Sequence, residues 1–161
     1  MPFALITGAS KGIGKAIARD LAARGYDLLL VARSEDLLKE TASEIAAGSR
    51  IGCRFLALDL SEEQAAEKVY AYCEQHTLPV QILVNNAGYG LSGPFEKYTG
   101  DAYADMLRLN IITLVRLTRL FLPGLKKQPN GFILNIGSSA AYQAVPFLSA
   151  YAASKSFVRA F

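Results

Sequence analysis

The sequence has few of the residues that build metal sites and disulfide-linked scaffolds. It contains one histidine, two cysteines and no tryptophan among 161 residues. With a single histidine, His76, a catalytic His–Asp pair or a histidine-rich metal site is hard to build, and we expect this residue on the surface near a helix C-terminus. Cys53 and Cys73 lie in different predicted elements and lack metal-ligand spacing. We therefore predict free thiols in a reducing compartment and no metal site.

Long apolar runs and long runs of one charge are also missing. The apolar stretch at residues 111–122 is broken by Arg116 and Arg119, so we predict no transmembrane helix. Residues 3–7 form a short apolar stretch that leads straight into a glycine-rich turn, which is unlike a signal peptide. The net charge of +3 is mild, and without a basic run nucleic acid is not an expected partner. The expectation is a soluble cytoplasmic protein without a membrane partner.

The chain does contain enough apolar sequence to fill a core. Hydrophobic residues make up 52% and charged residues 19%, which favours a single folded domain over residues 1–161. Short apolar segments predict buried strands at residues 3–7, 28–32, 54–58, 81–85 and 132–137. Longer amphipathic segments predict helices at residues 13–24, 35–47, 62–76, 101–127 and 149–161. Buried strands separated by helices indicate an α/β fold with a doubly wound parallel sheet covered on both faces.

Local signals mark where some of these helices begin and end. Gly25 stands at the usual position after a helix C-terminus, and Ser61 is the expected N-cap of the third helix. The last predicted helix runs to Phe161 without a cap or tail. We therefore expect the sequence to be part of a longer polypeptide.

The predicted helix at residues 101–127 is apolar on more than one face, whereas a surface helix needs only one apolar stripe. The surplus fits either a second burial surface for a partner subunit or a helix deeply covered by its own core, and both interpretations stay open. The first of them predicts a homodimer or homotetramer that forms through this helix and the helix that carries Tyr151.

A glycine-rich segment follows the first predicted strand and opens the first predicted helix. It reads Thr7-Gly8-Ala9-Ser10-Lys11-Gly12-Ile13-Gly14. Glycines allow a tight turn, and the N–H groups at the start of a helix can meet a pyrophosphate. The alternative is an ordinary strand-to-helix turn, but the strand–turn–helix context favours nucleotide binding. The expected cofactor contacts in this segment are Gly8, Ser10, Lys11, Gly12, Ile13 and Gly14.

A second feature near the end of the chain points to proton transfer. Tyr151 and Lys155 are four residues apart in a predicted helix and therefore share one helix face. An ammonium group beside a phenol stabilises the phenolate, which makes the tyrosine able to donate or accept a proton at working pH. The alternative for Tyr151 is a packed aromatic side chain.

In their order and spacing, the motifs of this chain resemble those of the short-chain dehydrogenase/reductase family. Besides the glycine segment and Tyr151-x-x-x-Lys155, the chain has Asn85-Asn86-Ala87-Gly88 after the fourth predicted strand and Asn110 in the long helix. Ser138 lies 13 residues before Tyr151. The resemblance covers the whole chain and implies a Rossmann-type fold. It also implies that the chain is truncated after the catalytic helix begins, because members of the family continue with two more strands and a mobile lid.

The resemblance implies a role for each matching residue. Tyr151 would be the general acid in carbonyl reduction or the base in alcohol oxidation. Lys155 would support the phenolate and bind the nicotinamide ribose, Ser138 would bind the substrate oxygen, and Asn110 would hold a water in a proton relay. Ser138 could instead be a helix cap, with Ser139 in its place, and Asn110 could satisfy backbone groups at a kink. Further cofactor contacts implied by the resemblance are Asp59, Leu60, Asn86, Ala87, Gly88, Tyr151 and Lys155.

The charges near the second strand predict the choice of cofactor. NAD-preferring sites place a carboxylate at the end of this strand, where the present chain has Val31-Ala32-Arg33. Arg33 can bind a 2′-phosphate, and Lys11 adds a second cation, so we predict a preference for NADP(H) over NAD(H). Alternatively, both cations are solvated at the surface, and Asp59 could equally be a turn former.

The loops after the fourth and fifth strands are expected to face the substrate, and their mostly apolar side chains favour an apolar or mixed carbonyl compound. The candidates are Tyr89, Gly90, Leu91, Gln143, Val145 and Phe147. We therefore expect an NADPH-dependent oxidoreductase that acts on a carbonyl or secondary alcohol. The alternative is a non-catalytic NADP(H)-binding regulatory or scaffold protein. An epimerase or dehydratase is less favoured, because related extended families usually carry a differently spaced glycine motif.

Overall fold

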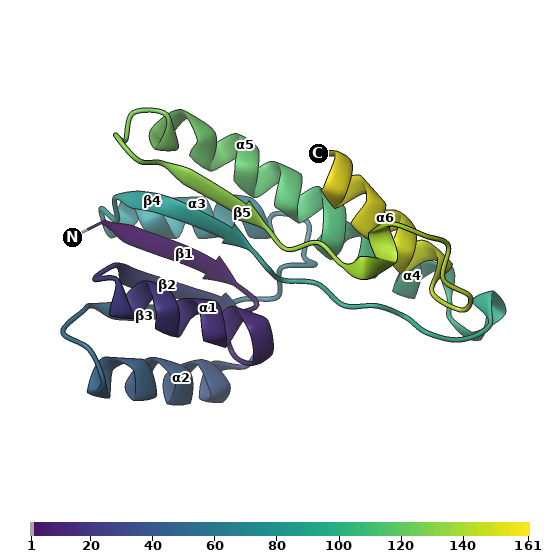
Figure 1. The fold of residues 1–161 in the computed structure, drawn as a ribbon, viewed down its shortest axis with the longest axis horizontal. Coiled ribbons are helices and arrows are strands. Elements are labelled where there is room, and N and C mark those ends of the chain that lie inside the picture. The colour runs from purple at the N-terminus through teal and green to yellow at the C-terminus, as the bar shows by residue number, and fades with distance from the viewer. Residues whose placement is uncertain (1) are drawn as a thin grey trace.

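Five parallel strands form one sheet in the order β3-β2-β1-β4-β5, as the computed structural model of residues 2–161 shows (Figure 1). The strands are β1 (Phe3–Thr7), β2 (Asp27–Ala32), β3 (Cys53–Ala57), β4 (Val80–Asn85) and β5 (Phe132–Asn135). The chain starts in the middle of the sheet, builds outward to β3 and then returns to the other side of β1. The strand order therefore reverses between β1 and β4, where open α/β sheets bind their ligands.

The helices alternate with the strands, so the Rossmann-type doubly wound arrangement is confirmed. They are α1 (Gly12–Ala23), α2 (Glu35–Ala47), α3 (Ala65–Gln75), α4 (Gly100–Leu107), α5 (Leu114–Leu125) and α6 (Ser149–Ala160). A π-helical segment, η2 (Arg108–Thr113), joins α4 to α5. Two short 3₁₀ helices, η1 (Phe95–Lys97) and η3 (Ser139–Ala141), lie in the loops after β4 and β5.

Alternating strand residues build a separate apolar cluster on each face of the sheet. On one face, Leu5 and Leu29 pack in a cluster that includes residues of α3 and α5. On the other face, Ile6 and Leu30 pack in a cluster that includes residues of α1 and α2. Figure 1 shows α2 below the sheet and α5 above it. Because fully burying a leucine contributes about 1.5–3 kcal/mol, the two clusters hold the strand ends, and the loops that follow them, in fixed positions.

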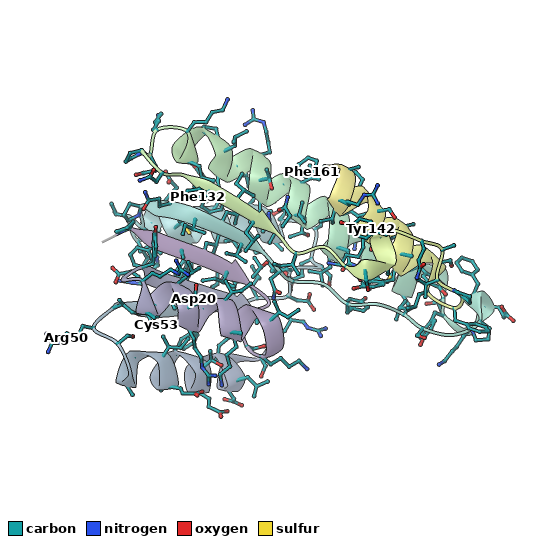
Figure 2. The ribbon with its side chains drawn as sticks, in the orientation of Figure 1. Asp20, Arg50, Cys53, Phe132, Tyr142 and Phe161 are labelled. Carbon is teal, nitrogen blue, oxygen red and sulfur yellow. The ribbon has the colours of Figure 1, made fainter. Side chains whose placement is uncertain are left out.

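The prediction that both faces of the sheet are covered is wrong at β5. The side chains of Phe132 and Leu134 are 57% and 45% exposed, whereas Ile133 between them packs against the cluster under α5. Figure 2 labels Phe132 on this outer strand. Among residues 2–161, the cluster on the α1–α2 face extends only as far as Ile82 and Val84 of β4. Apolar composition alone therefore did not indicate that one side of β5 stays open.

Two helix predictions near the site also need correction. The third helix begins at Ala65 rather than at residue 62, and Ser61 is not its N-cap. The N–H and hydroxyl of Ser61 instead donate to the carboxylate of Asp59, at 2.9 and 2.7 Å, which holds the chain in a turn. The helix predicted at residues 101–127 is interrupted by η2 and ends at Leu125.

Other local predictions are confirmed. Gly25 follows α1 with a φ of +85°, a conformation that glycine adopts without strain. His76 is exposed at the C-cap of α3, and Cys53 and Cys73 are free cysteines in β3 and α3.

The apolar surplus of the long helical segment is mostly used inside the chain. Leu117, Phe121 and Leu125 of α5 are buried in the core cluster, while Ile112 and Leu122 remain 50% and 36% exposed. Association through this segment and α6 stays a prediction. Within residues 2–161, the helices are too short or too polar to cross a bilayer.

Candidate functional site

The carboxyl ends of β1, β2, β3 and β4 open onto one cavity of about 340 Å³. Because the strands are parallel, the loops that follow them meet at this edge of the sheet. Nine residues predicted to contact the cofactor line the cavity, and six other residues complete it. The lining consists of Gly8, Ser10, Lys11, Ala32, Arg33, Ser34, Leu37, Leu58, Asp59, Leu60, Asn86, Ala87, Gly88, Tyr89 and Leu109.

The glycine turn is tied to the end of β4 by side-chain hydrogen bonds. The amide of Asn86 donates to the carbonyls of Thr7 and Gly8, at 2.9 and 3.0 Å. The hydroxyl of Thr7 accepts the N–H groups of Asn86 and Ala87, both at 3.0 Å. A Cβ added at Gly14 would collide with the carbonyl oxygen of Gly8 and the amide of Asn86, so only glycine fits there. The loop therefore has a fixed shape before any ligand arrives.

This turn fits the pyrophosphate of a dinucleotide. Among residues 2–161, no side chain caps the N-terminus of α1 and its first turn carries no acidic residue, so the free N–H groups are available to an anion. Gly12 has a φ of +56°, and a Cβ placed on it would meet no atom within 4 Å, so the space beside the turn is open. Lys11, Gly12 and Ile13 are exposed around this space.

The far end of the cavity carries charges of both signs. The guanidinium of Arg33 is 73% exposed and lies 3.9 Å from the carboxylate of Asp59. Burial disfavours the charged form of Asp59, but hydrogen bonds from Ser61 and the nearby Arg33 outweigh it, and the pKa of Asp59 is lowered. Asp59 is therefore ionised at neutral pH and partly neutralises the charge of Arg33. Lys11 is a second cation in the lining of the cavity.

Tyr151 and Lys155 project from α6 toward the same edge of the sheet. The side chain of Lys155 is buried, and its Nζ donates to the carbonyl of Ile136 at 2.8 Å, just beyond β5. The same Nζ lies 6.0 Å from the ring centroid of Tyr151. Burial lowers the pKa of Lys155. The backbone of Gly90 packs on the tyrosine ring, because an added Cβ would lie 3.0 Å from Cγ and Cδ2 of Tyr151.

Asn110 is buried in the π-helical segment, and its side chain makes three hydrogen bonds within the chain. Its Oδ1 accepts the N–H of Tyr89 at 3.1 Å, and its Nδ2 donates to the Tyr89 carbonyl at 2.9 Å and to Ser154 Oγ at 3.1 Å. The hydroxyl of Ser154 donates in turn to the carbonyl of Tyr151 at 2.7 Å. The Asn110 side chain thus satisfies backbone groups, as the alternative interpretation supposed, and connects the loop after β4 to α6.

Ser138 lies between β5 and α6, where its hydroxyl caps η3. The oxygen accepts the N–H of Ala140 at 3.1 Å, and the half-buried hydroxyl keeps its proton to donate elsewhere. Ser139, the other candidate, is exposed within η3. A binding role for Ser138 is compatible with this cap and stays a prediction.

The predicted substrate loops divide between two places. Gln143, Val145 and Phe147 line a groove between the loop after β5 and α6, whereas Tyr89 lines the cavity at the carboxyl ends of β1 to β4. A hydrogen bond of 3.0 Å from the N–H of Gly93 to the carbonyl of Phe147 brings the two loops together.

The sequence interpretation missed the contribution of Ser154. This residue is completely buried, and its hydroxyl joins Asn110 to the turn of α6 that carries Tyr151. A polar residue on the same side of the helix as Tyr151 and Lys155 was the available signal. Among residues 2–161, no group of His, Cys, Asp and Glu side chains is placed to hold a metal ion.

Comparison with known proteins finds one family along the whole chain. The family described as short chain dehydrogenase matches residues 2–161. The chain is 37% identical over 161 residues to a very-long-chain 3-oxoacyl-CoA reductase of Anas platyrhynchos, a match that covers 97% of this chain and 51% of that protein. The chain spans about half the length of the curated relatives that it matches.

Solved structures of similar proteins share the fold. The alcohol dehydrogenase from Thermococcus sibiricus, complexed with 5-hydroxy-NADP, is 33% identical with a TM-score of 0.91, over 99% of this chain and 68% of that chain. A short-chain dehydrogenase from Sphingobium yanoikuyae in complex with NADPH is 35% identical with a TM-score of 0.90, over 98% of this chain and 62% of that chain.

Proposed function

The chain belongs to the short chain dehydrogenase family, and from this premise we propose that it is an NADPH-dependent oxidoreductase acting on a carbonyl or secondary alcohol. One observation carries the proposal. The glycine turn and the cations Lys11 and Arg33 lie at the carboxyl edge of the sheet, where the strand order reverses, and the pair Tyr151–Lys155 adjoins the same edge beside Gly88, Gly90 and Ile136.

The residues around the cavity support NADP(H) as the cofactor. The open turn at Gly12 and the uncapped start of α1 suit a pyrophosphate. Arg33 follows Ala32 at the end of β2, so a 2′-phosphate would find a cation where NAD-preferring sites have a carboxylate. The relatives from Thermococcus sibiricus and Sphingobium yanoikuyae, crystallised with 5-hydroxy-NADP and NADPH, agree with this choice.

The proposed proton transfer uses Tyr151. A bound nicotinamide supplies or accepts the hydride, and the phenol of Tyr151 donates a proton to the carbonyl oxygen or removes one from the alcohol. Lys155 stabilises the phenolate and is held toward it by its hydrogen bond to Ile136. Ser138 binds the substrate oxygen through its remaining hydroxyl proton, and Asn110 keeps the loop after β4 in place and supports a water in the proton relay.

The substrate we propose is a carbonyl compound with an apolar substituent. The groove between the loop after β5 and α6 is lined by side chains such as Val145, Pro146 and Phe147. Curated relatives are named very-long-chain 3-oxoacyl-CoA reductases, so a 3-oxoacyl thioester is the first compound to assay.

The proposal is tested by NADPH oxidation with a panel of carbonyl compounds, for the chain and its Tyr151→Phe variant. Removing the general acid should lower turnover by about 10²–10⁴-fold while NADPH binding stays intact. Tyr26→Phe is the matched control, because Tyr26 lies beside the start of β2, at the opposite end of the sheet. Near-normal turnover by Tyr151→Phe would contradict the mechanism. Tight NADPH binding without turnover on the whole panel would instead support the non-catalytic regulatory or scaffold function.

A further inference from the structure

Tyr89 lines the cavity proposed to bind the nucleotide, which we call the nucleotide cavity, and not the groove lined by Gln143, Val145 and Phe147. It lines the same cavity as Lys11, Arg33 and Asp59, although it directly follows the Asn-Ala-Gly segment at the end of β4. Its ring is half-buried. Arg33 and Asp59 both act on the pKa of Tyr89, so its phenol lies near the end of the cavity where these two residues are.

The backbone of Tyr89 is fixed from both sides by one buried residue. The Oδ1 of Asn110 accepts the Tyr89 N–H at 3.1 Å, and Nδ2 donates to the Tyr89 carbonyl at 2.9 Å. Asn110 is 1% exposed, so these bonds are shielded from water. The stretch of loop that carries Tyr89 is therefore already ordered, so a ligand that contacts Tyr89 does not have to order this backbone first.

The charges around the phenol decide its chemical state. Burial and the carboxylate of Asp105 raise the pKa of Tyr89, Arg33 opposes them, and Asp59 adds to the increase. The phenol therefore keeps its proton at neutral pH. A neutral hydroxyl beside Arg33 can donate to an anion, whereas a phenolate would repel it.

We propose that Tyr89 is a cofactor-specificity residue whose hydroxyl donates a hydrogen bond to the 2′-phosphate of NADP(H) beside Arg33. The inference rests on the proposed cofactor site and extends it. Arg33 is 73% exposed and already lies 3.9 Å from Asp59, so a second donor from the loop after β4 adds a contact that Arg33 alone does not provide. The loop after β4 thereby takes part in distinguishing NADPH from NADH.

The test is a set of binding titrations with NADPH, NADH, adenosine 2′,5′-bisphosphate and adenosine 5′-monophosphate. Tyr89→Phe removes the hydroxyl and retains the ring and the backbone bonds to Asn110. The variant should bind NADPH and the bisphosphate about tenfold more weakly, which is the loss expected for a hydrogen bond to a charged group. Its affinities for NADH and the monophosphate should change by less than about twofold. Tyr26→Phe is the control and should change none of the four affinities.

The outcomes separate this inference from the proposed function. Suppose that the unmodified chain prefers NADPH. If Tyr89→Phe then binds NADPH as tightly as the unmodified chain, or binds NADPH and NADH more weakly by the same factor, the assignment of Tyr89 is overturned and the cofactor site stands. If the unmodified chain binds neither dinucleotide, both are overturned. A second variant, Tyr89→Leu, guards against an effect of phenylalanine itself and should show the same selective loss of the two ligands that carry a 2′-phosphate.

Discussion

The ammonium group of Lys155 donates a 2.8 Å hydrogen bond to the main-chain carbonyl of Ile136, one residue beyond the end of β5. This bond ties α6 to the sheet at the edge where the nucleotide cavity opens. It also keeps the ammonium group beside the phenol, because the same Nζ lies 6.0 Å from the ring centroid of Tyr151. The position of the proposed proton donor therefore depends on a buried cation.

That burial makes stability depend on pH at the alkaline side. The pKa of Lys155 is lowered from its ordinary value of 10.5 by burial. At pH values between the pKa of Lys155 in the folded chain and its ordinary pKa, the unfolded chain binds more protons than the folded chain. The contribution of Lys155 to the free energy of unfolding therefore rises with pH in this range, and it is lost as the pH falls through the pKa of the folded chain. Lys155→Met lacks this dependence. Urea unfolding of both chains from about pH 8 to about pH 10 should show the unmodified chain gaining stability relative to the variant.

Lys126→Met controls for the loss of a lysine, since Lys126 is exposed after the end of α5. The difference in free energy of unfolding between Lys126→Met and the unmodified chain should stay constant over the same pH range. A constant difference for Lys155→Met as well would contradict the burial of this ammonium group.

The glycine turn should tolerate no side chain at Gly14. Gly14→Ala places a Cβ against the carbonyl oxygen of Gly8 and should destabilise the fold by about 1–3 kcal/mol, because the turn is held by Asn86 and cannot yield freely. NADPH binding should fall with it. Gly124→Ala in α5 is the matched control: its added Cβ meets no atom within 4 Å, so it should stabilise the chain by about 0.5–1 kcal/mol. Equal unfolding midpoints for the two variants would show that the turn is looser than the structure indicates.

Arg33 should contribute to the affinity for the 2′-phosphate. Arg33→Ala removes charge-assisted hydrogen bonds and is expected to weaken NADPH binding by about 10–100-fold while NADH binding changes little. Arg50→Ala is a suitable control, because Figure 2 shows Arg50 projecting from the loop between α2 and β3, away from the cavity. If Arg33→Ala weakens both dinucleotides alike, Arg33 does not select between them.

The two cysteines should be slow to react in the folded chain. Burial raises the pKa of Cys53 to about 11, and burial with the nearby Glu74 raises that of Cys73 to about 12. Because the thiolate is the reactive form, alkylation near neutral pH should be slow for both and slower for the buried Cys73. Both should react quickly in urea. Rapid labelling of Cys73 without denaturant would contradict its place in the core.

Much of the fold follows from local patterns in the sequence. The short apolar segments predicted the five strands within a few residues of their observed bounds, and the amphipathic segment at residues 35–47 predicted α2. Gly25 correctly marked the end of α1. The π-helical segment could not be predicted in this way, because its residues have the same apolar periodicity as the helices on either side. Asn110 in this segment bonds to Tyr89 and Ser154, which are distant in sequence, and only the folded chain brings them together.

The candidate site divides in the same manner. Glycine spacing and the Tyr151–Lys155 pair are local signals, and the structure places both at one sheet edge. Tyr89 lines the cavity beside the glycine turn, and two backbone hydrogen bonds to the distant Asn110 fix it there, whereas its position in the loop after β4 predicted a place beside the substrate. The exposure of Phe132 and Leu134 in β5 depends on which helices cover this outer strand, and the apolar composition of the strand does not predict which helices do so.

The most direct test of the proposed cofactor site is a fluorescence titration of the purified chain with NADPH and, separately, with NADH. The glycine turn at the start of α1 and the cations Lys11 and Arg33 predict that NADPH binds at least about tenfold more tightly, since each charge-assisted hydrogen bond to the 2′-phosphate contributes on the order of 1.5–3 kcal/mol. A preference for NADH would contradict the role given to the two cations. Binding of neither dinucleotide would contradict the cofactor site itself.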